Sequence, residues 1–165
     1  MHEKSIELLN KAVADELSAV HQYMYFHFLL DDLGYDLLAG LFKKTAIEEM
    51  MHVEKLAERI LFLKGDVVMK VKDEVKPLKE VEKMLELAAQ MEQDSVQEYN
   101  VWANESAANN DSASKQLFES LVADEERHYD QYDTEADNLK KFGDRYLALQ
   151  SIERSKNLSA GNTTA

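Results

Sequence analysis

The chain has 165 residues with one proline, five glycines, no cysteine and a formal net charge of −13 at pH 7. That length suffices for one domain with a buried core, and the lack of cysteine excludes disulfides, zinc fingers and thiolate catalysis. A surface of this charge repels nucleic acid and attracts cations, although excess acid can also serve solubility alone. The longest apolar runs are too short to cross a bilayer, and the N-terminal MHEKSIE lacks a signal-peptide pattern, so we expect a cytoplasmic protein.

Long uninterrupted helices are favoured by the scarcity of proline and glycine. Apolar residues recur at helical spacing in four segments, the first from about 5 to 31 and the second, after the break DDLGYD, from about 36 to 63. The next stretch, KGDVVMKVKDEVKPLKE, is not helical in pattern and holds the single proline, Pro77, with a short apolar alternation over 67–71. It is long enough to travel back along a helical bundle.

The third helical segment runs from about 79 to 107 and, after the polar break ANNDSA, the fourth runs from about 113 to 141. Gly143 is placed to end the fourth helix, and DRYLALQSIERS predicts a short fifth helix. The polar end, 154–165, is predicted to be a disordered tail, which leaves one domain over 1–153. Two short-loop hairpins joined by a long crossover predict an all-α fold, the up-down-down-up four-helix bundle of ferritin-like proteins.

Each of the four apolar stripes carries a glutamate near its middle; these are Glu16, Glu49, Glu92 and Glu125. The second and the fourth of them are each followed three residues later by a histidine, His52 and His128. Adding 76 to the numbers of Glu16, Glu49 and His52 gives the numbers of Glu92, Glu125 and His128. The same shift relates Tyr23 to Tyr99. The two hairpins therefore look like copies related by a pseudo-two-fold axis.

The predicted helices bring these six side chains to a similar height in the bundle, because each glutamate lies roughly 20–25 Å of helix from its turn. Four unpaired carboxylates in a poorly solvated core would repel one another strongly, and the stripes hold no lysine or arginine to balance them. Two divalent cations would balance them. One Glu from each of two helices and Glu-x-x-His from each of the others is the di-iron or di-manganese carboxylate pattern, and these ligand types suit Fe or Mn.

At these residues the chain resembles the bacterioferritin family. ADELSAVHQYMYF, IEEMMHVEKLAERILFLKG and DEERHYDQYDTEADNLKKFG are similar to the family's first, second and fourth helices, and the likeness extends from about 3 to 153. The resemblance implies that the ligands of a di-iron ferroxidase centre are Glu16, Glu49, His52, Glu92, Glu125 and His128. It implies that Tyr23 is the tyrosine close to that centre. It also implies a hollow shell of identical chains with 24 subunits favoured, and the 12-subunit shell of a mini-ferritin-like protein is the alternative.

The family also binds haem across a subunit two-fold axis through one methionine from each chain, and Met50 matches that methionine. The alternative is that Met50 only packs at a helix interface, and Lys43 and His21 stand where aromatic or small polar residues are expected near the haem. An inner-surface iron site known in some members is not expected, because Lys44 and Thr45 replace its ligand types.

Residues and resemblance together predict a ferroxidase and iron-storage protein. Two Fe(II) ions bind in the bundle, O₂ or H₂O₂ oxidises them, and Fe(III) passes to a cavity as mineral. Glu49 and Glu125 are expected to bridge the metals, and Tyr23 to be an outer-sphere hydrogen bonder and one-electron donor, or else a plain core residue. The rivals are a mini-ferritin-like oxidative-stress protein and a di-metal peroxidase or catalase. The oxidant, Fe against Mn, and the redox partner stay open, and no nucleic acid or membrane partner is expected.

Overall fold

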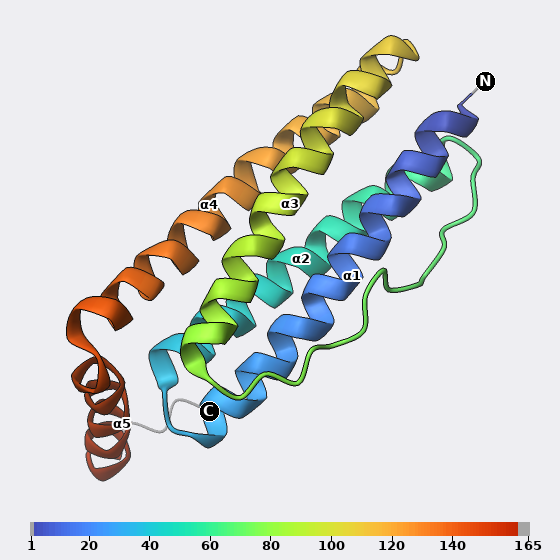
Figure 1. Ribbon diagram of the computed structural model, residues 1–165. Helices are drawn as coiled ribbons and strands as arrows, with labels where there is room; N and C mark the ends of the chain where they lie inside the picture. The colour runs from blue at the N-terminus through green and yellow to red at the C-terminus, as the bar shows by residue number, and fades with distance from the viewer. Residues whose placement is uncertain (1, 162–165) are drawn as a thin grey trace.

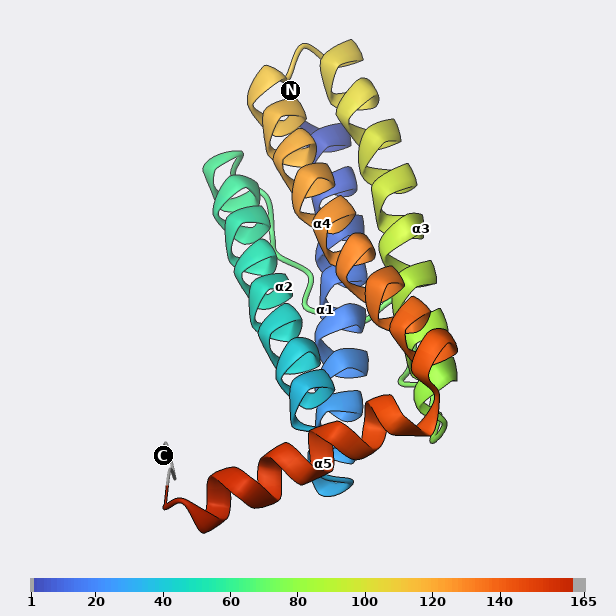
Figure 2. The same cartoon turned by 90° about the vertical axis from the view of Figure 1, so that its left-hand side faces the viewer.

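The computed structural model describes residues 2–161, and every regular element in that range is an α-helix. The helices are α1 (Glu3–Asp32), α2 (Asp36–Phe62), α3 (Val81–Ala108), α4 (Ser112–Phe142) and α5 (Asp144–Ser159). The first four lie side by side as a bundle, and α5 lies across one end of it (Figures 1 and 2). The predicted all-α bundle with a long crossover and a short fifth helix is confirmed, and each long helix begins and ends within two residues of its predicted bounds.

The two hairpins, α1 with α2 and α3 with α4, close their turns in the same way. The N–H groups of Tyr35 and Asp111 each donate to the carbonyl oxygen five residues earlier, at 2.9 Å in both turns. The residue before each donor, Gly34 or Asn110, has a positive φ, 80° and 57° respectively, which glycine and asparagine tolerate best. Since the same 76-residue shift relates the two turns, the hairpins repeat in backbone as well as in sequence.

The crossover between α2 and α3 runs in extended form along α1 (Figure 1). Three side chains of α1 bind its backbone by hydrogen bonds of 2.8–3.0 Å, namely Asn10, Ser18 and Gln22. The apolar alternation over 67–71 forms no strand, because the crossover bonds to helix side chains and has no neighbouring strand to pair with. These bonds hold the segment against the side of the bundle.

The core has two apolar clusters separated by a polar layer. The cluster toward the start of α1 contains Leu8, Leu9, Ala12, Val13, Leu56, Ile60, Phe118 and Leu121. The cluster toward the end of α1 contains Phe26, Leu30, Leu38, Phe42, Leu85 and Tyr132. Fully burying one large apolar side chain contributes about 1.5–3 kcal/mol. The two clusters thus stabilise a bundle whose middle, on all four helices, is occupied by charged side chains.

Helix α5 corrects one prediction, the disordered tail over 154–165. The helix continues to Ser159, because no glycine or proline interrupts it before Gly161 and Arg154 anchors it beside Asp36 at 3.4 Å. The N–H of Leu38 also donates to the buried side chain of Gln150 in α5 (3.2 Å). Residues 162–165 lie outside the described residues. No helix within 2–161 is both long and apolar enough to span a membrane.

Candidate metal centre

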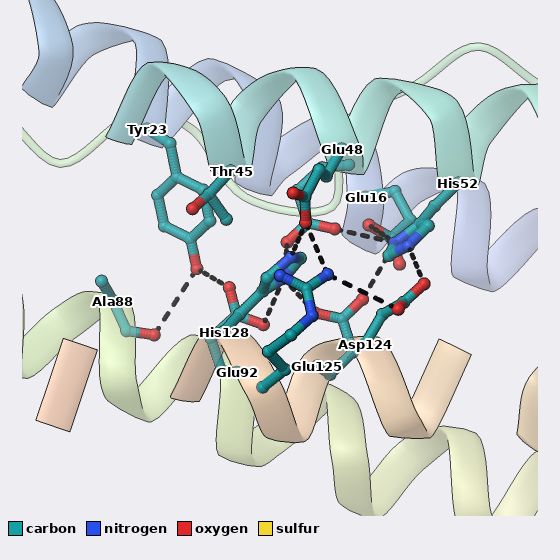
Figure 3. A network of polar contacts seen from close by, with 12 residues as sticks. Glu16, Tyr23, Thr45, Glu48, His52, Ala88, Glu92, Asp124, Glu125 and His128 are labelled. Carbon is teal, nitrogen blue, oxygen red and sulfur yellow. Dashed lines mark hydrogen bonds and ion pairs between the residues drawn. The ribbon is translucent and has the colours of Figure 1, made fainter. Parts of the chain in front are cut away.

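Six buried side chains meet in the polar layer of the bundle (Figure 3). They come from all four long helices and are Glu16 of α1, Glu49 and His52 of α2, Glu92 of α3, and Glu125 and His128 of α4. None is more than 2% exposed. Each Glu-x-x-His pair lies on one face of its helix because residues three apart are neighbours on the helical surface. The structure therefore brings together all six residues that the sequence selected.

The six side chains form two overlapping groups of metal-site size. In each group one oxygen or nitrogen atom per residue lies within 4.8 Å of the others. The first group is Glu16, Glu49, His52 and Glu125, and the second is Glu49, Glu92, Glu125 and His128. Glu49 and Glu125 belong to both groups, so the geometry suits two adjacent ions that share two carboxylates.

Each imidazole turns its Nδ1 toward the carboxylates. Nδ1 of His52 lies 2.9 Å from Glu49 Oε2 and 3.1 Å from Glu125 Oε1. Nδ1 of His128 lies 3.2 Å from Glu49 and 3.3 Å from Glu125. The two ring centroids are 6.0 Å apart. The nitrogens thus face the same two carboxylates from opposite sides.

Four buried atoms of the cluster make no well-aligned hydrogen bond among residues 2–161, although some of them lie only 2.9–3.1 Å apart. They are Glu49 Oε2, His52 Nδ1, Glu92 Oε2 and Glu125 Oε1. Buried polar atoms nearly always have partners, and an unsatisfied one is expensive. Two adjacent divalent cations, one in each group, would satisfy all four. The donor set of carboxylate oxygens with imidazole nitrogens fits iron or manganese.

The protein's own charges leave the cluster short of positive charge. Burial, and then the charges of Glu16 and Glu92, raise the pKa of Glu49 well above its usual range. Burial and the neighbouring glutamates raise the pKa of Glu125 in the same way. Burial by itself would lower the pKa of His52 and His128, but their glutamate neighbours outweigh it and raise both. The site therefore favours bound positive charge, as protons or as metal.

Comparison with known proteins identifies the family. The ferritin-like domain model, named Ferritin, matches residues 6–142. Bacterioferritin from Desulfovibrio desulfuricans is 37% identical over 145 residues, which are 88% of this chain and 81% of that protein. Bacterioferritin from Brucella melitensis is 38% identical over 149 residues, 90% of this chain and 92% of that protein. The chain belongs to the bacterioferritin family.

Solved bacterioferritins have the same fold. The Desulfovibrio desulfuricans bacterioferritin, whose structure is described with its di-iron site in different catalytic states, gives a TM-score of 0.88 at 36% identity. The match covers 90% of this chain and 86% of that one. Rhodobacter capsulatus bacterioferritin is described with a metal-free dinuclear site and haem iron. It gives a TM-score of 0.85 at 34% identity, and the match covers 90% of this chain and 92% of that one. The predicted ferritin-like topology is thereby confirmed.

Two acidic residues that sequence reasoning missed hold the outer side of the imidazoles in this chain. Nε2 of His128 lies 2.5 Å from Glu48 Oε2, and Nε2 of His52 lies 3.0 Å from Asp124 Oδ2. Glu48 and Asp124 each precede a core glutamate and are related by the same 76-residue shift. Each carboxylate thus supports the histidine of the opposite hairpin. Such a contact favours the tautomer with a protonated Nε2, which leaves Nδ1 free to bind metal.

Two fully buried tyrosines border the six side chains. The Tyr23 hydroxyl donates to Glu92 Oε1 (2.6 Å), and the Tyr99 hydroxyl donates to Glu16 Oε1 (2.5 Å). Burial, and then the nearby glutamate charges, raise the pKa of both phenols well above the usual range, so both stay protonated as donors. Tyr23 lies where the sequence predicted. Tyr99 was visible as its repeat, although no role was assigned to it.

Met50, which the bacterioferritin resemblance assigned to haem, is the predicted site residue that lies apart from the others. It is 46% exposed on the surface of α2. Ile47, one helical turn earlier, and the adjacent Met51 are each 52% exposed, whereas Glu54, one turn later, is an exposed charged neighbour. Thr45 is buried, and its hydroxyl donates to the Leu41 carbonyl oxygen (3.0 Å).

Proposed function

We propose that this chain is a ferroxidase and iron-storage protein that binds two iron ions in its bundle, oxidises Fe(II) and passes Fe(III) to mineral inside a hollow shell. The observation that carries the proposal is the pair of four-residue groups that share Glu49 and Glu125. Membership of the bacterioferritin family supports it, since the Desulfovibrio desulfuricans relative is described with a di-iron site.

The proposed ligand roles follow the two groups. Glu49 and Glu125 bridge the ions, because each can reach both positions. Glu16 and His52 complete one ion's ligands, and Glu92 and His128 complete those of the other. The four carboxylates balance the charge of two divalent ions, which relieves the repulsion that raises the pKa of Glu49 and Glu125.

When bound, two ferrous ions would supply the electrons that reduce O₂ or H₂O₂. The chain's own residues orient the ligands for that reaction. Tyr23 and Tyr99 hold the carboxylates of the outer ligands Glu92 and Glu16 through short hydrogen bonds. The hydrogen bond from Tyr23 to Glu92 supports its proposed role as an outer-sphere donor of one electron, with its proton passing to the carboxylate. The apolar clusters exclude bulk water from the two ends of the polar layer.

The proposed shell has 24 subunits, or else 12, and haem is proposed at a two-fold axis through Met50 of each chain. Exposed apolar surface supports contacts between chains. On α5, Leu149, Ile152 and Leu158 are between 59% and 64% exposed, and on α2 the surface around Met50 is similarly exposed. Such patches commonly mark protein–protein interfaces.

An anaerobic Fe(II) titration followed by oxidant tests the proposal. We expect two Fe(II) per chain and a fast oxidation phase that Glu49→Ala and Glu125→Ala each abolish, because losing a bridging carboxylate breaks the pair. Glu54→Ala, at an exposed position of α2, is the matched control and should oxidise iron normally.

Wild-type oxidation rates in either bridging variant would contradict the ligand assignment. Retention of ferric mineral by the assembled protein separates storage from the rival functions, a di-metal peroxidase or catalase and a stress protein, which turn over oxidant without building a core.

A further inference from the structure

A surface depression and an inner cavity meet beside the metal centre. The depression, about 430 Å³, is lined by Lys11, Ala14, Asp15, Lys72, Glu98 and Trp102. The cavity, about 60 Å³, reaches Tyr23, Glu49 and Glu92 and has room for a few waters. Both are lined by Asp15, Lys72 and Glu98. These three side chains therefore form a partition between the surface depression and the cavity that reaches the central carboxylates.

The partition is an ammonium group between two carboxylates from different hairpins. Lys72 Nζ lies 3.0 Å from Asp15 Oδ1 of α1 and 2.9 Å from Glu98 Oε1 of α3. The Asp15 side chain is only 8% exposed, and its buried Oδ2 has no hydrogen-bond partner among residues 2–161. One buried carboxylate oxygen at the cavity mouth thus remains free to bind a cation.

The lysine side chain can leave this position without moving the backbone. The crossover is fixed at this point, since the N–H of Lys72 and that of Asp73 donate to Ser18 Oγ at 2.8 and 3.0 Å. The Lys72 side chain itself is 48% exposed, and a lysine ammonium is a compact charge on a flexible four-carbon stem. Swinging it into solvent restores its hydration and its rotamer freedom.

The carboxylate pair then requires another cation. Without the ammonium, the facing carboxyl groups of Asp15 and Glu98 would need a shared proton or another cation, and Asp73 and Asp94 line the same cavity. A divalent ion balances the pair, whereas the single charge of the ammonium balances only half of it. Exchange of ammonium for a divalent cation is therefore favoured by charge, and oxygen ligands suit such ions.

We propose that Asp15 and Glu98 form a transit site for divalent cations, Fe(II) in particular, and that the Lys72 ammonium is its exchangeable occupant. The ion enters from the surface depression, displaces the ammonium into solvent and passes through the inner cavity toward Glu49 and Glu92. The identity of the ion as iron and its destination rest on the proposed function. The cation site itself rests only on the partition.

Cobalt(II) is a suitable probe because it binds oxygen ligands and is not consumed by oxidation. In crystals of Lys72→Met soaked with Co²⁺, we expect an anomalous peak between Asp15 and Glu98, because methionine keeps the length of the side chain and removes its charge. The peak should be weaker in wild type and lost in Lys72→Met/Glu98→Gln. No cobalt between the two carboxylates of Lys72→Met, at concentrations that fill the central site, would overturn the transit site.

The same crystals separate the two proposals. Cobalt at the central glutamates without cobalt at Asp15 and Glu98 leaves the proposed function standing and removes the transit site. Cobalt at Asp15 and Glu98 without cobalt at the central glutamates would support the transit site and contradict the proposed function.

A second measurement uses wild-type Lys72. Glu98→Gln should raise the Fe(II) concentration needed for half-maximal oxidation several-fold. Glu86→Gln removes the same charge from an exposed position of α3 and should leave that concentration unchanged. Equal shifts in both variants, or none in either, would show that only general surface charge matters and would contradict the proposal.

Discussion

At the scale of single residues, the two hairpins depend on each other. Glu48 of the first hairpin holds the ring of His128 in the second, and Asp124 of the second holds His52 in the first. Arg127 breaks this symmetry, because its guanidinium donates to Glu48 (2.7 Å) while the equivalent residue of the first hairpin is Met51. Burial would raise the pKa of Glu48, but Arg127 and then His128 outweigh it and lower that pKa. The two proposed ion positions therefore have different surroundings.

Removing Glu48 tests the contribution of this outer contact. Glu48→Ala should weaken binding of the ion beside His128 by about 10–100-fold, the usual effect of losing a carboxylate that orients a metal-bound imidazole. Glu48→Gln keeps an acceptor for the Nε2 proton of His128 and should therefore lose less metal affinity than Glu48→Ala. Anaerobic calorimetric titration with Co²⁺ measures both affinities. Two ions bound by Glu48→Ala with wild-type affinity would mean that His128 is oriented without Glu48.

The sequence predicted the six central side chains because their spacing repeats, and a repeated spacing is rare by chance. Glu48 and Asp124 obey the same repeat, but an acid next to a core position usually faces solvent. Only the packing of one hairpin on the other turns them toward the imidazoles. Lys72 belongs to no periodic pattern, so its place between Asp15 and Glu98 could not be predicted without the path of the crossover.

At the scale of elements, the helix bounds were predictable because apolar periodicity and turn residues agree. The left-handed Gly34 and Asn110 lie in DDLGYD and ANNDSA, the two polar breaks. The end of α5 was not predictable from composition. A polar sequence without glycine or proline is compatible with helix or coil, and the contact of Arg154 with Asp36 lies more than a hundred residues away in sequence.

The turn between α3 and α4 predicts that the stability of the fold depends on pH, because it contains Asp111, which caps α4. Its side chain accepts from the N–H of Ser114 (3.1 Å) and from Arg59 Nη2 (2.6 Å). Burial would raise the pKa of Asp111, but the hydrogen bond from the Ser114 hydroxyl (2.6 Å), together with those from the Ser114 N–H and Arg59, outweighs burial and lowers it to about 2. A lowered folded-state pKa gives stability that is present above the unfolded value of about 3.9 and is lost as pH falls toward 2.

Asp111→Asn keeps a side-chain oxygen that can cap α4 but removes the charge that strengthens the hydrogen bonds from Ser114 and Arg59, so it should lower the free energy of unfolding by about 1–2 kcal/mol at pH 7. The difference from wild type should narrow below about pH 4, where the unfolded-state aspartate is protonated. Thermal melts between pH 3 and pH 7 measure this, with Asp133→Asn, at an exposed position of α4, as control. A difference that stays constant across this range would show that the charge of Asp111 contributes nothing.

At the scale of the whole molecule, the bundle keeps a repulsive layer between two apolar clusters. Even with both imidazoles protonated, four ionised glutamates would leave the layer with an excess of two negative charges, which is why the pKa of Glu49 and that of Glu125 are raised. Each excess charge is buried, so solvent screens it poorly. The apolar clusters must offset this cost whenever metal is absent. The same layer should gain stability from any divalent ion that binds the folded protein alone.

Replacing Glu16 and Glu92 together by glutamine separates the cost of the charges from the rest of the layer. Glutamine keeps a carbonyl oxygen that can accept the hydroxyl hydrogen bonds of Tyr99 and Tyr23, so those contacts should survive. With two charges gone, the remaining carboxylates and the protonated imidazoles balance. The variant should melt at a higher temperature than wild type in chelator.

With metal bound, wild type should melt at a higher temperature than the Glu16→Gln/Glu92→Gln variant, because the variant has lost one ligand charge per ion. Free metal at 100 times its dissociation constant should stabilise wild type by about 2.7 kcal/mol, and the variant should gain much less. Melting curves of the assembled protein in chelator and in Co²⁺ give all four values, with Glu54→Gln/Glu86→Gln as a control for surface charge. If chelator leaves the wild-type melting temperature unchanged and the variant gains nothing without metal, the four glutamates do not share one repulsive site. In that case neither bridging by Glu49 and Glu125 nor delivery of iron to them could stand.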